Sequence, residues 1–335
     1  MNKLSVVILN YNGKKHLESF LSGVVDRSAP YEVVVVDNGS TDDSVAFVKE
    51  QVPAARLLLF TENHGFSGGY NKAIEQIESE YIVLLNSDVE VSAGWIDPVL
   101  AYMESQPAMA AAQPKIMDQK NPHLFEYAGA SGGYIDSLSF PFCRGRIFHT
   151  IEEDQQQYND AREVFWASGS CLFVKRAAYL EAGWLDNDFF AHMEEIDLCW
   201  RFWNMVYTVG VCPQSKVFHV GGGTLDKSQP RKTYLNFRNG LSLILKNEPM
   251  HKLWWKLPLR MGLDWLAALH FTFYSGIKHA GAIWKAHFHF LLGFWGHFKK
   301  RKLIVRKTTK NPRYRGLIFW LYFAQGQKRY SDVIR

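Results

Sequence analysis

The sequence Glu80-Tyr-Ile-Val-Leu-Leu-Asn-Ser-Asp-Val-Glu90 places polar groups directly after an apolar run. Residues 81–85 are too few for a buried helix, and they predict a strand that is buried on both faces. Asn86 and Asp88 follow at the carboxyl end of that strand, and ligands bind at this edge of open α/β sheets. A carboxylate with a second oxygen ligand two residues away suits a hard divalent cation such as Mg²⁺ or Mn²⁺, although a plain polar turn has the same composition.

The segments around this strand predict three further strands that alternate with helices. We expect strands at residues 4–10, 32–36 and 56–60, and helices at residues 14–25 and within the segment 63–79. Such alternation is typical of a parallel sheet with right-handed crossovers. The expected fold class is therefore α/β, with a Rossmann-like, mostly parallel sheet.

Polar residues at the ends of the first two strands indicate a nucleotide site that lacks a dinucleotide fingerprint. The first turn, residues 10–13, reads Asn-Tyr-Asn-Gly and does not fit GxGxxG; the glycine-rich segment follows the third strand instead. Asp37 ends the second strand, where its carboxylate can accept hydrogen bonds from a ribose or a base edge. The alternative is that Asp37 belongs to a helix-capping turn with Gly39 and Ser40.

A second acidic centre lies in residues 188–197, Asp-Phe-Phe-Ala-His-Met-Glu-Glu-Ile-Asp. Its three closely spaced carboxylates, Glu194, Glu195 and Asp197, are embedded among apolar side chains, which is a poor setting for plain surface. Carboxylates near the start of a helix also favour its dipole, so a structural role is the alternative. Asp197 can pair with Arg201 one turn later, and we expect that pair to be structural.

Three other segments carry weaker signals. Trp166 precedes the tight turn Ser168-Gly169, which fits either a sugar site or a buried Trp. His219 ends a strand beside a glycine turn, and a lone histidine in such a place is usually not a ligand. The pair Arg238-Asn239 lies on the next predicted helix, where a simple charge on the helix face is the alternative.

Residues 92–160 are expected to contribute scaffold and no chemistry. A helix is predicted at 95–104, and the glycines and Pro141 that follow predict loops or short strands. His123, His149 and the carboxylates of residues 152–154 are expected on the solvated surface.

Size and composition describe a globular chain. The length of 335 residues allows one large domain or two, and 47% hydrophobic with 21% charged residues excludes a disordered chain. The four cysteines form no CxxC pair, which is typical of buried thiols in a reducing compartment. Met1 leads directly into a strand, so we expect no signal peptide and a cytoplasmic location.

The carboxyl-terminal part is strongly basic and aromatic. Residues 246–335 hold 18 of the 38 Lys and Arg and 3 of the 33 Asp and Glu, a net charge of +15, and leave −10 for residues 1–245. A membrane-spanning helix needs about 20 apolar residues, and Arg260, Asp264, Lys278 and Lys285 interrupt every such window. Amphipathic helices lying on an anionic membrane surface, with residues 299–302 facing the headgroups, fit this pattern. Nucleic acid is the rival partner, and none is expected.

Four motifs, in order, resemble a family 2 glycosyltransferase with the GT-A fold: residues 6–12, 35–42, 63–71 and 84–88. The resemblance covers roughly residues 4–245 and is closest to the branch that includes bacterial rhamnosyltransferases. It implies a GT-A domain over residues 1–245, followed by a membrane-associating helical region over residues 246–335. The enzyme would lie peripherally on the inner face of the cell membrane.

The resemblance also implies roles for individual residues. The first acid of the family's DXD motif is Asn86 here, so Asp88 would carry most of the metal binding, with His219 completing the site. Glu195 would be the catalytic base in place of the family's aspartate, and its extra methylene keeps Glu194 as a candidate. The implied nucleotide-sugar contacts are Asn10, Tyr11, Asn12, Asp37, Asn63, Gly65, Asn71, Asn86, Trp166, Ser168, Gly169, Arg238 and Asn239.

The function implied is that of an inverting glycosyltransferase of the hexosyl type that depends on Mg²⁺ or Mn²⁺. It would move a sugar from a nucleotide-diphosphate donor, with dTDP-rhamnose or a UDP-sugar favoured, to a glycan or lipid-linked acceptor in cell-surface polysaccharide synthesis. One alternative is a non-catalytic nucleotide-sugar-binding or scaffold protein on the same fold. Nucleotidyl transfer is disfavoured because residues 10–13 provide no basic glycine-rich loop.

Overall fold

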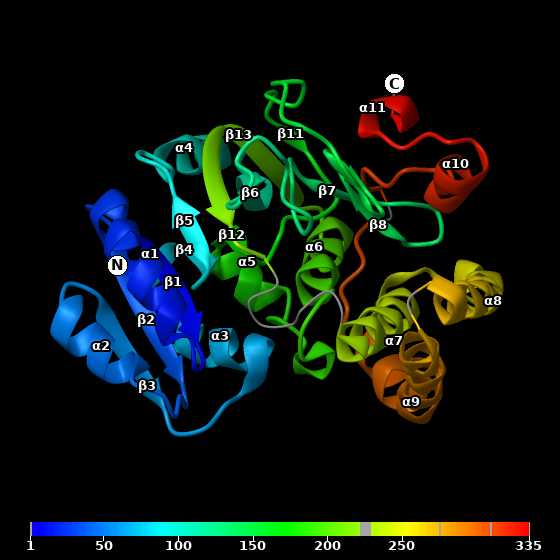
Figure 1. Ribbon diagram of the computed structural model, residues 1–335, viewed down its shortest axis with the longest axis horizontal. Coiled ribbons are helices and arrows are strands. Elements are labelled where there is room, and N and C mark those ends of the chain that lie inside the picture. The colour runs from blue at the N-terminus through cyan, green and yellow to red at the C-terminus, as the bar shows by residue number, and fades with distance from the viewer. Residues whose placement is uncertain (1, 222–228, 275, 309, 335) are drawn as a thin grey trace.

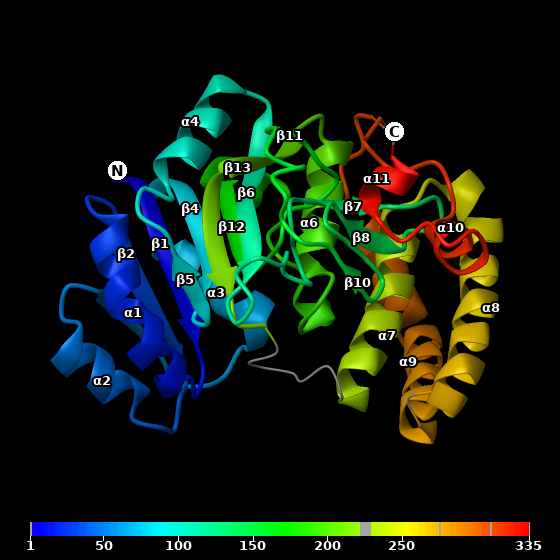
Figure 2. The ribbon, with the colours of Figure 1, turned by 45° about the horizontal axis from the view of Figure 1, so that its top comes forward.

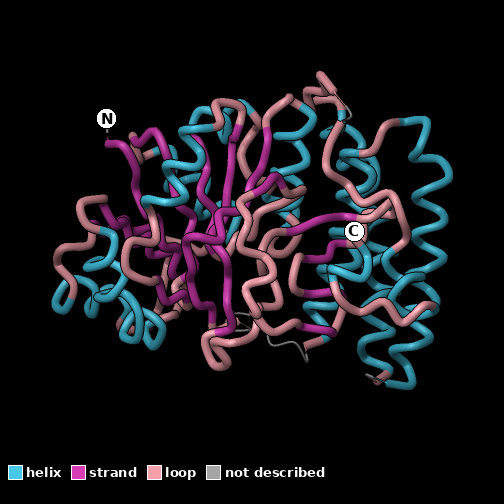
Figure 3. Tube along the Cα trace, turned by 90° about the horizontal axis from the view of Figure 1, so that it is seen from above, coloured by secondary structure: helices cyan, strands magenta, loops and turns pink. Residues whose placement is uncertain are grey.

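The computed structural model describes residues 2–221, 229–274, 276–308 and 310–334. An α/β unit forms the amino-terminal end of the molecule, and long helices stand side by side at the opposite end (Figure 1). The same separation is visible from above, where the strands gather on one side and the longest helices on the other (Figure 3).

A nine-stranded sheet forms the centre of the α/β unit, in the order β11-β13-β6-β12-β4-β1-β2-β3, with β5 paired to β13. Strands β1 to β4 form a parallel block and β13 pairs with β6 in parallel, whereas β12 runs antiparallel between β4 and β6. The α/β, mostly parallel prediction is therefore confirmed. The strands are β1 (Asn2–Asn10), β2 (Glu32–Asn38), β3 (Arg56–Phe60), β4 (Ser79–Asn86), β5 (Val89–Val91), β6 (Met109–Asp118), β11 (Arg162–Glu163), β12 (Cys171–Lys175) and β13 (Thr208–His219).

Helices cover both faces of this sheet because successive side chains of a strand point to opposite sides. On β1, Val6 and Ile8 pack with one group of helices, and Val7 packs with the other. The first group is α1 (Lys14–Ser28), α2 (Ser44–Gln51) and α4 (Asp97–Ser105). The second is α3 (Gly65–Glu75), α5 (Arg176–Glu181) and α6 (Glu194–Asn204). The apolar run of residues 81–85 on β4 is thus buried on both faces, as predicted.

A small antiparallel sheet occupies the region between β6 and β11, where short strands were expected. Its strands are β7 (Gly133–Ile135), β8 (Pro141–Cys143), β9 (Arg146–Ile147) and β10 (Thr150–Ile151). His123 and His149 are exposed, as predicted, but the prediction was wrong for Glu152 and Asp154. Glu152 is buried and accepts a hydrogen bond from the Tyr158 hydroxyl at 2.8 Å. Asp154 binds the fully buried Lys115 ammonium at 2.9 Å. Asp154 therefore neutralises a buried charge, and Glu152 holds the Tyr158 hydroxyl, so both carboxylates have structural contacts.

The carboxyl-terminal helices form a bundle that is tied back to the α/β unit. Helices α7 (Pro230–Asn247), α8 (Met250–Tyr274) and α9 (Ile277–Arg301) pack on one another, and Figure 2 shows them at the far end from β1. The chain then returns to the small sheet through α10 (Ile318–Ala324) and α11 (Tyr330–Val333). The Ile318 amide donates to Asp136 at 3.0 Å, and the Tyr330 amide donates to Glu152 at 2.9 Å. The terminal segment is therefore part of the folded core.

Helices α8 and α9 bury charged side chains and expose apolar ones. Arg260 and Asp264 are buried and form an ion pair at 2.9 Å. On the outside, Trp254 and Phe273 are each 76% exposed, and Trp295 is 69% exposed. Across the described residues, no helix is long and apolar enough to cross a membrane.

Candidate active site

The register of the parallel strands brings polar side chains to one edge of the sheet. Asn10 at the end of β1 stands opposite Asp37 of β2, and Leu9 of β1 stands opposite Asn86 of β4. The carboxyl ends of these strands share an edge because the strands are parallel. Asp37 and Asn86, which belong to the motifs at residues 35–42 and 84–88, therefore lie at the same edge of the sheet.

Asp37 is buried and forms the base of this edge. Its Oδ1 accepts a hydrogen bond from the Asn10 amide at 3.2 Å, and its Oδ2 accepts from the Ser40 backbone at 2.9 Å. Asn10 Oδ1 is buried and finds no hydrogen-bond partner among the described residues, which is unusual for a buried polar atom. Next to it, Asn12 has a positive φ of 51° and accepts from the Thr41 backbone at 2.7 Å. Tyr11 beside it is 50% exposed.

Asp88 and His219 meet where β4 and β13 end. His219 Nε2 lies 3.1 Å from Asp88 Oδ1, and its other ring nitrogen, Nδ1, lies 3.4 Å from Glu126 Oε1. Burial alone would lower the pKa of His219, but the carboxylates of Glu126 and Asp88 outweigh it and raise that pKa to about 10. Burial opposes ionisation of Asp88 as well, yet the hydrogen bond with His219 keeps its pKa below the usual value.

This cluster has the donor types of a divalent-cation site. A carboxylate and an imidazole lie together, and an ion that draws its other ligands from water and a diphosphate needs few protein ligands. Glu126 lies on the far side of the imidazole from Asp88. In metal proteins a carboxylate at this place accepts a hydrogen bond from the metal-binding histidine and orients its ring. Within the ranges that the structure describes, however, no three His, Cys, Asp or Glu side chains are arranged as a metal site. The Asp88–His219 contact would have to open for an ion to enter.

The two candidate bases begin helix α6. Glu194 is buried and Glu195 is partly exposed. Within the described part of the chain, the Oε2 atom of each is buried and has no hydrogen-bond partner. Burial and the neighbouring charge of Glu195 hold the pKa of Glu194 well above its usual range. Burial raises the pKa of Glu195 to about 7. Burying carboxylates without hydrogen-bond partners lowers the free energy of unfolding. Groups that carry such a cost cluster at functional sites, so the start of α6 is a candidate for one.

Residues 168–170 join the acidic helix start to the strand edge. The backbone N–H of Asn86 donates to the Ser170 carbonyl at 3.0 Å. A Cβ placed on Gly169 would lie 3.8 Å from Glu195 Cβ and 3.6 Å from the Phe66 ring, so a side chain here would occupy the space between them. Ser168 is buried, its amide donating to Gln113 at 2.8 Å. The structure thus brings the two predicted centres together, although more than one hundred residues separate them in the chain.

The backbone leading into α6 is strained and is held from outside. His192 and Met193 adopt positive φ values of 69° and 74°, which non-glycine residues rarely do. The Asn239 amide donates to the carbonyls of Phe189, Ala191 and His192 at 2.7–2.9 Å. Arg238 donates to the Asp188 and Phe189 carbonyls at 2.8 and 3.0 Å. These two predicted ligand contacts therefore fix the conformation of the segment that precedes the candidate bases.

Asp197 anchors the same helix to α7. It is fully buried and accepts from Arg201 at 2.9 Å, as predicted, and also from Lys246 at 2.9 Å and Asn247 at 2.7 Å. Three donors satisfy this carboxylate, so its role is structural.

The remaining predicted contacts lie around the edge with their side chains in use. Asn63 Oδ1 accepts from Asn38 at 3.0 Å and from the Gly65 amide at 2.8 Å, which shapes the turn before α3. Asn71 Oδ1 accepts from the Tyr179 hydroxyl at 2.6 Å, and its amide donates to the Leu185 carbonyl at 2.9 Å. These residues connect segments that carry the site.

Trp166 is a core residue in this structure. It is 2% exposed, and its indole donates to the Tyr134 carbonyl at 3.0 Å. Its ring packs directly on Gly133, where any Cβ would clash at 2.0 Å. Of the two interpretations of Trp166, a sugar contact or a buried core residue, these surroundings fit the buried residue.

Sequence reasoning missed Glu126 and Asn38 as parts of the site. Asn38 stands beside Asp37 in a motif that was recognised, so its position was a usable signal. Glu126 lies in the region expected to carry no chemistry, and no local pattern distinguishes it. Only the packing of the segment after β6 against β13 brings it to His219.

Comparison with known families agrees with this geometry. Residues 5–181 match the model of the family described as "Glycosyl transferase family 2". The match spans more than half of the 335 residues, and the chain belongs to this family. It is therefore a glycosyltransferase by family, and the predicted resemblance is confirmed.

Two named relatives resemble most of the chain. It is 28% identical over 285 residues to the N-acetylglucosaminyl-diphospho-decaprenol L-rhamnosyltransferase of Mycobacterium tuberculosis, covering 79% of this chain and 91% of the relative. It is 25% identical over 250 residues to the low-salt glycan biosynthesis hexosyltransferase Agl10 of Haloferax volcanii, covering 71% and 74%. The rhamnosyltransferase-like branch is thus supported.

Two solved structures share the fold. The mannosyltransferase PcManGT of Pyrobaculum calidifontis, in complex with GDP-Man and Mn²⁺, has a TM-score of 0.51 and 17% identity, covering 90% of this chain and 85% of that one. GalNAc-T7 with UDP, GalNAc and Mn²⁺ has a TM-score of 0.55 and 15% identity; the match covers 73% of this chain but 48% of that one. At these identities the likeness establishes the GT-A fold alone.

Proposed function

We propose that this chain is an inverting glycosyltransferase in which Glu195 is the base that activates an acceptor hydroxyl. The observation that carries the proposal is the pair of unpartnered carboxylates at the start of α6, which reaches the strand edge through Gly169. Because Glu195 is partly exposed and Glu194 is buried, Glu195 is the more accessible to a substrate.

The proposed reaction is a single displacement. The acceptor oxygen forms a bond to the anomeric carbon while the bond from that carbon to the donor diphosphate breaks on the opposite face, which inverts the anomeric configuration. The proton of the hydroxyl passes to the Glu195 carboxylate, and the nucleoside diphosphate leaves with the bonding electrons. The sheet edge and the α6 start hold the two reactants in line, which supplies a proximity effect.

The donor nucleoside would lie against Asn10 and Asp37, where an unpartnered buried oxygen is available. Asp88 and His219 would hold a divalent cation, Mg²⁺ or Mn²⁺, and such an ion would neutralise the diphosphate as a leaving group. The two fold relatives crystallised with Mn²⁺ support this part of the proposal.

The favoured donor is dTDP-rhamnose, with a UDP-sugar as the alternative. The mycobacterial relative is named as a rhamnosyltransferase that acts on a decaprenol-linked diphospho-sugar. By analogy we propose a lipid-linked or glycan acceptor for this chain, in the synthesis of a cell-surface polysaccharide.

We also propose that α8 and α9 lie on the anionic inner face of the cell membrane. Their outward stripes are aromatic and aliphatic, and the Trp265 and Trp284 rings stack across the two helices at 5.5 Å. Exposed apolar faces of this extent mark interaction surfaces, and the +15 charge of residues 246–335 complements anionic lipid. Binding there would bring the active site to a lipid-linked acceptor at headgroup level.

Donor hydrolysis over a set of nucleotide-sugars, with Mn²⁺ or Mg²⁺ and with chelator, tests the enzymatic proposal. We expect turnover of one donor class that chelation abolishes, and an inverted anomeric configuration in the transfer product. Donor binding without hydrolysis or transfer would instead favour the non-catalytic alternative. Full activity in excess chelator would remove the metal from the proposal.

A further inference from the structure

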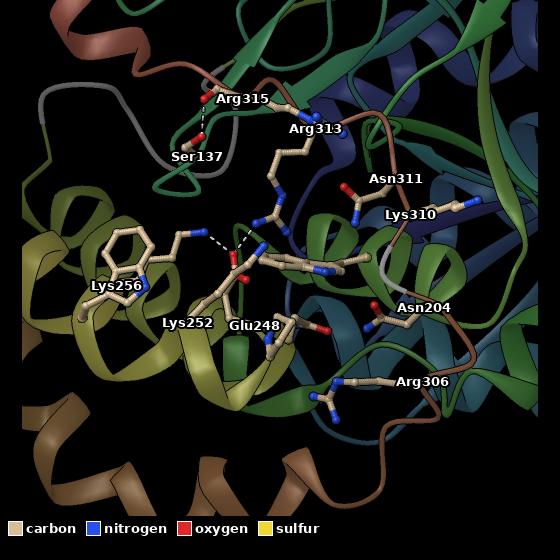
Figure 4. Close-up of a pocket in the computed structure, with 14 residues that line it drawn as sticks. Ser137, Asn204, Glu248, Lys252, Lys256, Arg306, Lys310, Asn311, Arg313 and Arg315 are labelled. Atoms are coloured by element: carbon tan, nitrogen blue, oxygen red, sulfur yellow. Dashed lines mark hydrogen bonds and ion pairs between the residues drawn. The ribbon is translucent and has the colours of Figure 1, made fainter.

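A cavity lies at the opposite end of α6 from the two candidate bases. It has a volume of about 600 Å³ and lies between the end of α6, the α7–α8 junction and residues 306–308 and 310–315 (Figure 4). Asn204, which lines it, is nine residues beyond Glu195 on the same helix, a separation of about 13 Å along the axis. The cavity is therefore distinct from the place where sugar transfer is proposed.

The lining of this cavity is strongly cationic. Six basic residues line it: Lys252, Lys256, Arg306, Lys310, Arg313 and Arg315. Among the described lining residues, Glu248 is the single carboxylate, and it pairs with both Lys256 and Arg313 (Figure 4). Positive charge is thus left in excess.

Several lining groups are also short of acceptors. Among the residues that the structure describes, three buried donors have no hydrogen-bond partner: Arg306 Nε, Arg313 Nε and Asn204 Nδ2. The other guanidinium nitrogens of Arg306 donate to the backbone carbonyls of Arg301 and Lys246. Desolvation lowers the pKa of Lys256 to about 8 despite the attraction of Glu248, which fits a site with too little negative charge. Phosphate oxygens are the acceptors that such a set of Arg and Lys side chains matches.

The cavity adjoins the proposed membrane face. Trp255 lines the cavity and is 52% exposed. Its neighbour Trp254, which belongs to the exposed apolar side chains of α8 and α9, is 76% exposed. Lys252 precedes Trp255 by three residues and is exposed on the same first turns of α8. A ligand that enters beside Trp255 would therefore have its polar end in the cavity and its apolar part along the helices.

We propose that this cavity binds the phosphate group of an anionic membrane lipid, and so holds the enzyme in one orientation on the bilayer. This inference rests on the proposed membrane association of α8 and α9. The site differs from a diffuse basic surface because it encloses the headgroup between three elements, α6, α8 and the segment of residues 306–308 and 310–315. It therefore recognises phosphate and not negative charge alone.

The test compares two vesicle types in a phosphate-free digalactosyldiacylglycerol background: one with phosphatidate and one with sulfoquinovosyldiacylglycerol at equal surface charge. The chain should co-sediment more strongly with the phosphatidate vesicles. The triple variant Lys252→Gln, Lys310→Gln, Arg315→Gln removes exposed lining cations and should abolish this preference, with a loss of about fivefold in affinity per cation. The matched control Lys278→Gln, Lys285→Gln, Lys302→Gln removes three exposed charges elsewhere in the same region and should keep the preference.

The outcomes separate this inference from the proposed function. Equal loss in the two triple variants, or equal binding of wild type to both vesicle types, overturns the phosphate site while membrane association stands. Failure of wild type to bind any vesicle overturns the membrane proposal itself. Protection from thermal unfolding by inorganic phosphate at concentrations that match the lipid effect would assign the site to a soluble phosphate and overturn the lipid source.

Discussion

The two carboxylates at the start of α6 have different surroundings, and the difference assigns their roles. Glu194 is 5% exposed, and burial together with the neighbouring charge of Glu195 holds its pKa well above the usual range. Glu195 is partly exposed, with a pKa of about 7, close to the optimum for a general base working near neutrality. The partly exposed Glu195 carboxylate can therefore receive a proton from a bound substrate, whereas the buried Glu194 is less accessible to one.

Glu195→Gln keeps the shape of the side chain but cannot accept a proton. We expect donor affinity to stay within a factor of about two and kcat to fall on the order of 10²-fold or more, as removal of a general base typically does. Initial rates and calorimetric titration with the donor measure the two quantities. Glu194→Gln is the matched variant, and a dead Glu194→Gln beside an active Glu195→Gln would reverse the assignment.

The raised pKa of Glu195 also predicts opposite pH trends for activity and stability. The folded state holds this proton up to about pH 7, whereas the unfolded chain releases it near the ordinary value of 4.5. Ionisation therefore costs folding free energy increasingly above pH 4.5, and the cost is complete above about pH 7. Activity should rise through pH 7 while Tm falls relative to Glu195→Gln. A variant no more stable than wild type at pH 8 would contradict this.

Glu126 is expected to support the cation site without binding the ion. Its carboxylate lies 3.4 Å from His219 Nδ1, where it orients the ring so that Nε2 faces Asp88. Glu126→Gln should weaken Mn²⁺ binding by about 10- to 100-fold, as loss of such partners typically does. Electron paramagnetic resonance of free Mn²⁺ measures this directly, and the exposed Glu153→Gln serves as control. Unchanged Mn²⁺ affinity would show that Glu126 has no part in the site.

At the scale of elements, α7 holds in place the segment that carries the proposed base, Glu195. Asn239 and Arg238 bind the strained backbone before α6, while Lys246 and Asn247 bind Asp197 within α6. Positive φ values at His192 and Met193 persist because these contacts outweigh their cost. The helix that begins the carboxyl-terminal bundle therefore also supports the segment that carries the two candidate bases.

Lys246→Met tests this tie because it removes the cation that Asp186 and Asp197 share at 2.6 and 2.9 Å. Breaking one partner of a buried ion pair leaves an uncompensated charge, and we expect a loss of about 3–5 kcal/mol in the free energy of unfolding. Urea denaturation measures the change, with the exposed Lys49→Met as control. A loss no larger than that of the control would mean that Arg201 and Asn247 alone satisfy Asp197.

The elements themselves were largely predictable, since alternation of apolar runs and turns is a local property of the chain. The strands that end in Asn10, Asp37 and Asn86 follow directly from it, and parallel pairing then aligns those ends. The proximity of Glu126 to His219 could not be predicted, because the segment that follows β6 brings the two together across the fold. The burial of Arg260 and Asp264 was equally hidden, because sequence shows that charges interrupt an apolar stretch but not which way they face.

At the scale of the whole molecule, the carboxyl-terminal helices differ from an ordinary surface bundle in what they bury and what they expose. Beside an apolar core they bury two ion pairs, Lys256 with Glu248 and Arg260 with Asp264, and they expose large apolar side chains such as those of Trp254, Phe273 and Trp295. Exposed aromatic rings are unfavourable in water, because their apolar surface stays hydrated and contributes no hydrophobic stabilisation. A lipid interface would bury those rings and leave the internal pairs undisturbed.

The membrane proposal is best tested with point variants, because residues 318–330 bond to the small sheet and their deletion would expose it. Wild type should bind anionic vesicles with an affinity that falls in high salt without vanishing, since screening weakens the charge attraction but not the insertion of apolar rings. Trp254→Gln, Phe273→Gln and Trp295→Gln together should remove the binding that survives high salt.

The control for that variant is Leu59→Gln. Leu59 is an apolar residue that is 53% exposed, and it lies on β3, an edge strand of the large sheet and not part of the helical bundle. Co-sedimentation at low and high salt, with duplex DNA in a parallel series, measures the outcome. If the salt-resistant binding depends on the three aromatic residues and not on Leu59, the apolar face is what contacts lipid. If wild type binds DNA tightly and vesicles not at all, the basic bundle has a different partner, and access to a lipid-linked acceptor must come from elsewhere.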